Sequence, residues 1–231
     1  MTSAKAIFVK QTLDMLKNKV VLIQFILFPL LALIFTELVA KPNDSIPKSM
    51  FVTIFAAIFI GYTILTTTAG IIAEDMERKS LRFLVIAGVK PHEYFLGTCG
   101  IILLATLLVS AVFGLIGNFT GMTLVRFTCV MMFGSVASML LGAVVGILCK
   151  NQQSAHAAGM SVATIVGFGP MITMFNKTVE RIFSVFYTQQ INAVVNSLSA
   201  SFVDAMSVIG VNIAVLAVLF VLAYGKKGLR D

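Results

Sequence analysis

Residues 49–91 read SMFVTIFAAIFIGYTILTTTAGIIAEDMERKSLRFLVIAGVKP. The first part of this stretch, residues 49–73, carries no charge and is long enough for one helix to cross the hydrocarbon core, which takes about 20 mostly apolar residues. Acids and bases then crowd into residues 74–91. An uncharged run that ends abruptly in charge is typical of a helix that emerges from a lipid bilayer.

The composition of the whole chain agrees with this interpretation. Of the 231 residues, 58% are hydrophobic and 12% charged, and the mean hydropathy is +0.99. Soluble domains have about a quarter of their residues charged. The net charge of +7 could suggest nucleic acid as a partner, but the bases lie in short clusters between long uncharged runs. The composition therefore excludes an ordinary soluble enzyme, a disordered tail and a nucleic-acid module.

Uncharged runs predict an all-α integral membrane protein that forms a single transmembrane domain over residues 1–231. The run over residues 182–203 contains too many amides and hydroxyls for a helix that faces lipid. We therefore predict that residues 177–203 form a re-entrant or amphipathic segment before the last span. The six predicted spans are 20–40, 50–73, 96–117, 127–149, 155–175 and 205–224.

Residues 1–19 are predicted to form an amphipathic helix at the membrane interface. Apolar residues recur at helical spacing on one face: Ala6, Val9, Leu13 and Leu16. Charged residues recur at the same spacing on another face: Lys10, Asp14 and Lys17. Such a helix lies flat on a membrane surface and leads into the first span.

The basic residues predict the orientation. If the N-terminus is cytoplasmic, 12 of the 17 Lys and Arg residues lie in cytoplasmic segments. We therefore expect a multi-pass protein of the plasma membrane with both termini in the cytoplasm. The 74–95 loop is then cytoplasmic and the 177–203 segment extracellular.

The 74–95 loop carries the most specific pattern. Leu81, Leu84 and Val85 share one face of a predicted short helix, and Gly88 followed by Pro91 ends it. A charged amphipathic helix that projects from a membrane suits docking into a groove of another protein. The alternative is a solvated loop that only satisfies the charge asymmetry.

The motif in this loop resembles that of the ABC-2-type permeases, the membrane subunits of ATP-binding-cassette (ABC) exporters. Their pattern is similar to E-R-x-G-T-L-E-x-L-L-x-x-P, and this chain has ERKSLRFL at 77–84 and AGVKP at 87–91. Ser80 and Arg82 depart from the pattern. The six spans, the N-terminal helix and the polar segment before the last span also resemble this family.

The resemblance implies a coupling helix that docks on a cytoplasmic ATPase. The residues it assigns to that helix are Glu77, Arg78, Lys79, Leu81, Arg82, Phe83, Leu84, Val85 and Gly88. It further implies two ATPase subunits and a second permease chain, identical or related. Leu84→Asp is then expected to abolish ATPase binding.

The chain is not expected to be an enzyme by itself. It lacks the GxxxxGK[ST] phosphate-binding motif, so ATP and Mg²⁺ would be bound by the partner ATPase and no cofactor by this chain. No metal site is expected either, because Cys99, Cys129 and Cys149 show no paired spacing and His156 has no ligand-type neighbours in the sequence.

Polar residues and backbone breakers within the spans are the candidates for the transport pathway. These are Gln24, Thr63 and Thr67, with a static kink or a hinge expected at Gly167, Gly169 and Pro170. In the fourth span, Gly134, Ser138, Gly142 and Gly146 recur every four residues, which predicts close packing on a neighbouring span. The alternative is a face that forms a dimer. The resemblance implies a dimer interface built by the first and fifth spans, so we expect the fourth span to pack within its own chain.

The spans have no charge in their middle, which argues against a gradient-driven secondary carrier. An uncharged pathway suits a hydrophobic or amphipathic cargo, such as a peptide, an antimicrobial, a lipid-like molecule or a drug. Two alternatives to an exporter permease stay open at this point: a membrane scaffold or sensor that recruits a cytoplasmic partner, and a small secondary carrier.

Overall fold

The computed structural model describes residues 3–43, 46–196 and 202–227, and every regular element in that part of the chain is a helix. Six helical segments are long and apolar enough to cross a membrane. Their bounds are Lys19–Ala40, Ser49–Glu77, Pro91–Ile116, Gly121–Leu148, Gln152–Thr173 and Phe202–Gly225. The prediction of an all-α protein with six apolar spans is therefore confirmed.

Two of these segments combine α-helix with a π-helical turn. The first consists of α2 (Lys19–Phe35) and η1 (Thr36–Ala40), and the second of α3 (Ser49–Ile58), η2 (Phe59–Ile64) and α4 (Leu65–Glu77). The other four are α6 (Pro91–Ile116), α7 (Gly121–Leu148), α8 (Gln152–Thr173) and α11 (Phe202–Lys227). Four shorter helices complete the fold: α1 (Ser3–Lys17), α5 (Ser80–Ile86), α9 (Lys177–Phe183) and α10 (Gln189–Asn196).

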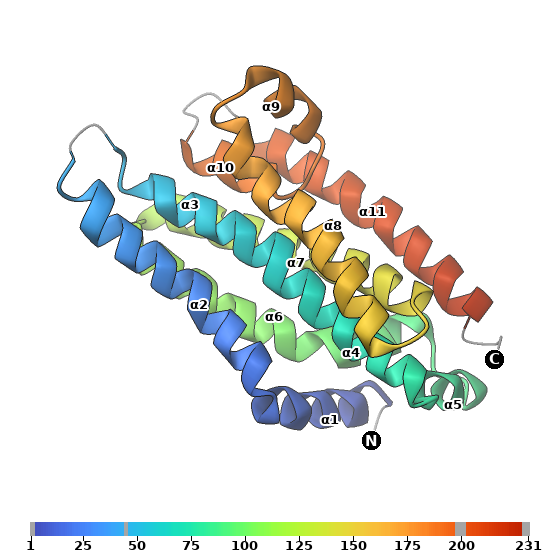
Figure 1. Ribbon diagram of the computed structural model, residues 1–231. Coiled ribbons are helices and arrows are strands. Elements are labelled where there is room, and N and C mark those ends of the chain that lie inside the picture. Colours follow the sequence, from blue (N-terminus) through green and yellow to red (C-terminus); the bar gives the residue numbers. More distant parts are fainter. Residues whose placement is uncertain (1–2, 44–45, 197–201, 228–231) are drawn as a thin grey trace.

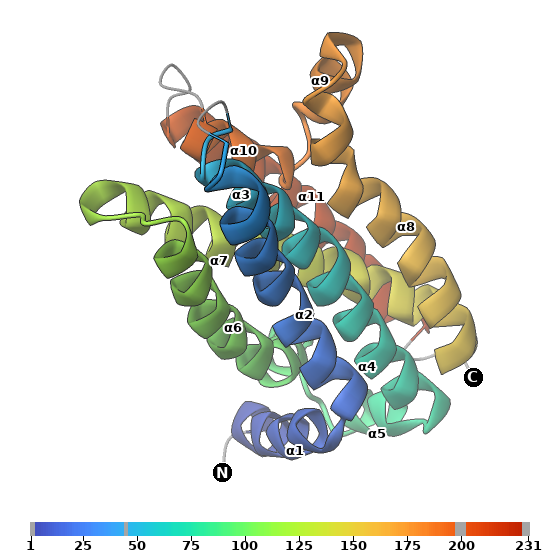
Figure 2. The same ribbon diagram turned by 60° about the vertical axis from the view of Figure 1, so that its left-hand side comes forward.

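The long helices form one elongated bundle with two distinct ends (Figure 1). At one end, called the α5 end below, α1 lies across the base of the bundle and α5 lies beside the last turn of α4 (Figures 1 and 2). The last turn of α11 lies at this same end, as an even number of spans requires. At the opposite end, called the α10 end, α9 and α10 connect α8 to α11.

The helix α1 uses two faces differently. Ile7, Gln11 and Met15 are buried against the bundle, whereas Val9 and Leu13 on the predicted apolar face are exposed. The predicted apolar face is therefore exposed. A different face, formed by Ile7, Gln11 and Met15 at intervals of one helical turn, packs on the bundle, where α1 contacts α6.

The helices extend beyond several predicted spans. The span predicted to begin at 127 starts at Gly121, so that Arg126 lies inside α7, where its guanidinium stands 5.9 Å from the centre of the Phe202 ring. A count of uncharged residues places an arginine outside a span, but its long apolar stem allows it to occupy the end of one. The turn before α7 uses positive φ angles at Asn118 (53°) and Gly121 (55°).

The glycines of α7 bring its backbone against α4. A Cβ at Gly142 would lie 2.5 Å from the carbonyl oxygen of Leu65, and one at Gly146 would lie 2.7 Å from that of Ala69. Membrane helices associate through such close backbone approach because lipid offers no hydrophobic driving force between them. The prediction that this stripe packs on another span of the same chain is confirmed.

The predicted hinge on α8 has a comparable packing role. α8 stays helical through Gly167, Gly169 and Pro170 and ends at Thr173. A Cβ at Gly61 in η2 would lie 2.5 Å from the Cα of Gly167, and one at Gly169 would overlap the ring of Phe183. Gly167 therefore lets the backbone of η2 approach α8, and Gly169 lets the ring of Phe183 approach it. The helix continues through both positions.

The polar segment before the last span folds back onto the bundle. Of residues 177–203, the structure describes 177–196 and 202–203, which comprise α9, α10 and the start of α11. Thr188 Oγ1 donates to the Val166 carbonyl (2.7 Å), and Asn192 Nδ2 donates to the Pro170 carbonyl (3.4 Å). The amides and hydroxyls that make this run unsuitable for lipid thus bind backbone carbonyls of α8, which explains its composition.

Tyr187 anchors this segment to the bundle. Ser138 Oγ donates to the Ile60 carbonyl in η2 (2.7 Å), so the Tyr187 hydroxyl donates to Ser138 Oγ over 2.7 Å. Burial raises the pKa of Tyr187, which keeps its hydroxyl protonated as a donor. The relay joins α7, η2 and the segment before α10 at one point.

We expect Tyr187→Phe to lower the free energy of unfolding by about 1 kcal/mol, because the buried Ser138 oxygen loses a donor. The thermal unfolding midpoint in detergent measures the change. Tyr187→Phe combined with Ser138→Ala should cost clearly less than the two single changes added together. Additive effects would contradict the relay.

Candidate functional site

The most densely connected polar group in the described chain lies where α1, α4, α5 and α6 meet. Its members, called the Asp75 junction here, are Lys10, Gln11, Asp75, Ser80 and Tyr94. Asp75 belongs to the last turns of α4, and the chain then reverses through Arg78 and Lys79 before α5 begins at Ser80. Lys79 adopts a left-handed φ of 59°, which permits this tight reversal.

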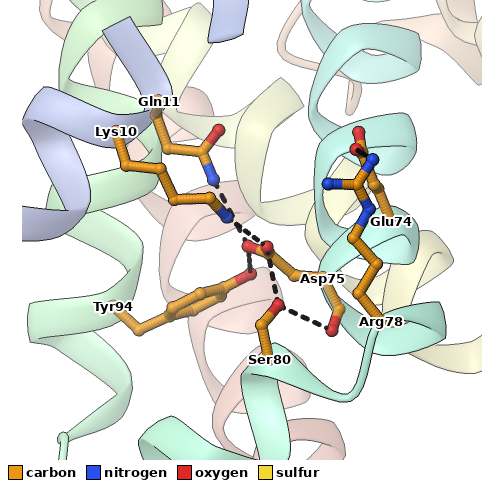
Figure 3. Close-up of polar contacts among 7 residues, drawn as sticks. All are labelled: Lys10, Gln11, Glu74, Asp75, Arg78, Ser80 and Tyr94. Carbon is orange, nitrogen blue, oxygen red and sulfur yellow. Dashed lines mark hydrogen bonds and ion pairs between the residues drawn. The ribbon is translucent and has the colours of Figure 1, made fainter. Parts of the chain in front are cut away.

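Asp75 is the hub of the junction (Figure 3). Its Oδ1 accepts from Lys10 Nζ (2.8 Å) and Ser80 Oγ (2.9 Å). Its Oδ2 accepts from the Tyr94 hydroxyl (2.9 Å) and Gln11 Nε2 (3.3 Å). One carboxylate therefore joins three other helices to the end of α4.

The burial of Asp75 makes this arrangement energetically significant. Asp75 is 3% exposed and Tyr94 fully buried, whereas the Lys10 side chain is half-exposed. A buried carboxylate is costly unless it is paired and hydrogen-bonded, and here four donors satisfy it. The Asp75 junction thus fixes α1 and the start of α5 to α4 and α6.

Two further contacts fix the end of α4, from which the chain turns into α5. Glu74 pairs with Arg78 one turn later (2.8 Å), and Glu77 Oε2 accepts from the backbone N–H of Gln152 at the start of α8 (2.9 Å). Carboxylates at helix N-termini are stabilised by the orphan N–H groups there. The residues flanking α5 are therefore bonded to α8 as well as to the Asp75 junction.

The other end of α5 is fixed by its C-cap. Gly88 ends the helix with a φ of 78°, and the Val89 N–H donates to the Leu84 carbonyl (3.0 Å). Val89 is buried, and its carbonyl accepts from the Tyr224 hydroxyl of α11 (3.2 Å). The prediction that Gly88 ends this helix agrees with the structure.

The exposed face of α5 is not the face of Leu81, Leu84 and Val85 that the sequence predicts for docking. Leu81 is fully buried, and Leu84 is partly buried against the same apolar cluster of this chain. The large apolar side chains on the open face are Phe83 (70% exposed) and Ile86 (68%), with exposed Arg82 beside Phe83. The leucines that share a helical face hold α5 on its own bundle, as an amphipathic stripe usually does. The side chain of Val85 lies outside the described part of the structure.

A comparison of the sequence with known families matches one of them. The sequence model of ABC-2 type transporters matches residues 2–187, which include the Asp75 junction, α5 and α8. The chain belongs to the ABC-2 type transporter family. No curated protein matched it. The chain is therefore the membrane-embedded permease subunit of an ABC transporter, and membership of this family implies partnership with an ABC ATPase.

The predicted pathway residues of this permease occupy different places. Gln24 and Thr67 line a cleft of about 170 Å³ toward the α5 end, bounded by α2, α4 and α8. Thr63 lies in η2, with a buried hydroxyl that has no hydrogen-bond partner in the described part of the chain. Gly167, Gly169 and Pro170 lie toward the α10 end of α8. The structure thus brings together only Gln24 and Thr67 of the predicted set.

Little in the sequence points to the Asp75 junction. Asp75 stood out only as one of several acids in the 74–95 loop, and its partners Lys10 and Gln11 lie 65 and 64 residues away. A usable signal is Gln11, a polar residue at helical spacing between the apolar residues Ile7 and Met15, with Lys10 next to it. Among the described residues, no group of three His, Cys, Asp or Glu side chains could hold a metal ion.

Proposed function

We propose that this permease is the transmembrane subunit of an ABC exporter in the plasma membrane, with the α5 end in the cytoplasm. Two separate ATPase subunits would dock on α5 of this chain and on that of a second permease, identical or related. These ATPases would bind ATP with Mg²⁺. The cargo would be hydrophobic or amphipathic: a peptide, an antimicrobial, a lipid-like molecule or a drug.

The observation that carries this proposal is the exposed apolar pair on a rigidly anchored helix. Phe83 and Ile86 are open on α5, while both ends of α5 are bonded into the bundle. Aromatic side chains and arginines are the usual anchors of a protein interface, and Phe83 and Arg82 supply one of each. A helix that is open on one side and fixed on the other suits transfer of force from a partner into the spans.

The placement of charge supports the orientation. The α5 end carries α1, the 74–95 loop and the last turn of α11, which together hold most of the basic residues of the chain. The exposed apolar face of α1, which includes Val9 and Leu13, suits contact with the lipid surface at the same level.

Phe83→Asp tests the docking role most cleanly, because Leu84→Asp would also disturb the apolar cluster of this chain. We expect Phe83→Asp to reduce co-purification of the ATPase by about tenfold or more, the loss of one buried aromatic anchor. The matched control is Phe175→Asp, which places the same change on an exposed ring just after α8 ends, away from the α5 end.

Equal recovery of the ATPase with Phe83→Asp and with Phe175→Asp would contradict the docking role. Transport of cargo into inverted vesicles only when ATP and the ATPase are present would separate an exporter from a scaffold. Cargo movement driven by an ion gradient without ATP would favour a secondary carrier instead.

A further inference from the structure

The cleft near the α5 end exists because α2 and α4 diverge there. α2 packs on α3 and η2 in its other half, while α8 packs along α4. The floor of the cleft is one face of α4, on which Thr67, Gly70, Ile71 and Glu74 follow the helical repeat. Its walls come from the start of α2 and the first turns of α8.

The lining of this cleft is divided into a polar and an apolar part. The polar part includes Gln24, Thr66, Thr67, Glu74, Gln152 and His156. The apolar part includes Val20, Val21, Ile71 and Met160. His156 reaches the floor because Gly70 has no side chain: a Cβ there would lie 2.7 Å from the imidazole Cε1. A cleft with these two parts fits an amphipathic molecule better than a purely apolar one.

Thr67 supplies an independent sign of a ligand. Its side chain lines the cleft and is only 4% exposed, yet its hydroxyl has no hydrogen-bond partner within the described residues. Its neighbour Thr66 instead donates to the Tyr62 carbonyl (2.7 Å), which is the usual solution for a threonine in a membrane helix. A buried polar group without a partner is costly, so a ligand that bonds Thr67 would remove that cost.

The charge of the lining indicates the kind of polar group. Glu74 carries a carboxylate, and no Lys or Arg lines the cleft, although the chain has 17 bases and 10 acids. Glu74 pairs with Arg78, whose side chain is largely exposed and lies outside the cleft. The Glu74 carboxylate is therefore the charged acceptor of the lining, the Thr67 and Gln24 oxygens add neutral acceptors, and the amides of Gln24 and Gln152 also supply donors. An ammonium group offers three donors and a positive charge to such a set.

We propose that this cleft receives the protonated amine of an amphipathic cargo, with its apolar part along Val20, Ile71 and Met160. The inference rests on the proposed exporter function and names the chemistry of its cargo. Glu74 would hold the ammonium by charge, with Thr67 and Gln24 as additional acceptors.

The test uses the absence of tryptophan from the chain. Met160→Trp places a fluorophore on the cleft wall, and Ile165→Trp places one on an exposed part of the same helix as a reference. The full chain is held in phosphatidylcholine nanodiscs, and 11-bromoundecylamine and 11-bromoundecanol are compared as quenchers. We expect the amine to quench Met160→Trp at about tenfold lower concentration than the alcohol, as one charge-assisted contact provides. At Ile165→Trp the two should quench alike.

Two substitutions then test the assigned groups in the Met160→Trp background. Glu74→Gln should remove the preference for the amine, and Thr67→Val should weaken amine quenching about three- to tenfold. The matched control is Thr164→Val, because Thr164 is exposed on α8 and donates to the Met160 carbonyl (2.8 Å). Thr164→Val should leave the preference intact.

Equal quenching by amine and alcohol at Met160→Trp would overturn the proposal, as would an amine preference unchanged by both Glu74→Gln and Thr67→Val. These outcomes are independent of the docking test. A chain that binds its ATPase through Phe83 but shows no amine preference would refute this inference alone. A chain that prefers the amine but binds no ATPase would refute the proposed function, while the proposed amine site would still be supported.

Discussion

Asp75→Ala is expected to detach α1 from the bundle and to uncouple α5 from the spans. The change removes the acceptor of the fully buried Tyr94 hydroxyl and of the Gln11 amide, while Lys10 can turn toward water. Removing one partner of a buried charged network costs several kcal/mol, and with Lys10 half-exposed we expect a loss of about 3 kcal/mol in the free energy of unfolding. Asp75→Asn, which keeps the shape and loses the charge, should cost less.

Limited proteolysis measures the release of α1 directly. Trypsin should cut after Lys10 and Lys17 on the order of tenfold faster in Asp75→Ala, because cleavage follows the population of the open form. Asp14→Ala is the matched control, since Asp14 is an exposed acid on the same helix. Cleavage of α1 at the same rate in Asp75→Ala and Asp14→Ala would show that the Asp75 junction does not hold α1.

Gly142→Ala is expected to disrupt the packing of α4 on α7. The new Cβ would lie 2.5 Å from the carbonyl oxygen of Leu65 and 3.2 Å from the N of Ala69, and backbone atoms cannot rotate away. Overpacking of this kind costs about 1–3 kcal/mol, and Gly142→Val should cost more because of its additional methyl groups. The thermal unfolding midpoint and the monodisperse fraction in detergent should both fall.

Gly210→Ala is the control for this prediction. Gly210 lies on α11, and a Cβ there would meet no atom within 4 Å. Alanine favours a helix over glycine by about 1 kcal/mol, so Gly210→Ala should be neutral or stabilising. The two substitutions are therefore expected to have opposite signs. A similar unfolding midpoint for both variants would contradict the close approach of α7 to α4.

Much of the fold could be predicted from the sequence because a bilayer imposes simple lengths and charge rules. The six predicted spans, the Gly88 cap and the small-residue stripe of α7 rest on local patterns, and each has its expected counterpart in the structure. The ends of the spans were less predictable. Arg126 lies inside α7, because the charge of a long side chain can reach past the end of an apolar region.

The candidate site was less accessible to sequence reasoning for two reasons. Periodicity shows which residues of α5 share a face but not which face meets the bundle, so Leu81 and Leu84 were assigned to a partner although they pack on this chain. Contacts between distant segments leave no local pattern either. Tyr94 and Lys10 converge on Asp75 from α6 and α1, and only the packing of those helices brings them together.

The glycines of α8 illustrate a third limit. A Gly-Phe-Gly-Pro sequence is compatible with a hinge, a kink or close packing, and these alternatives differ only in what lies opposite. In the structure Gly167 faces the backbone of Gly61 in η2, and Gly169 faces the ring of Phe183. The partner of each glycine, which the sequence does not specify, determines its role.

Photo-crosslinking from position 83 tests the central claim most directly. The claim is that α5 presents Phe83 to an ATPase subunit while the Asp75 junction holds α5 on the spans. A benzoyl-phenylalanine at position 83 should form a covalent adduct with the ATPase in cells, and the same group at position 175 should not. An adduct at position 175, or none with the ATPase at position 83, would contradict the account.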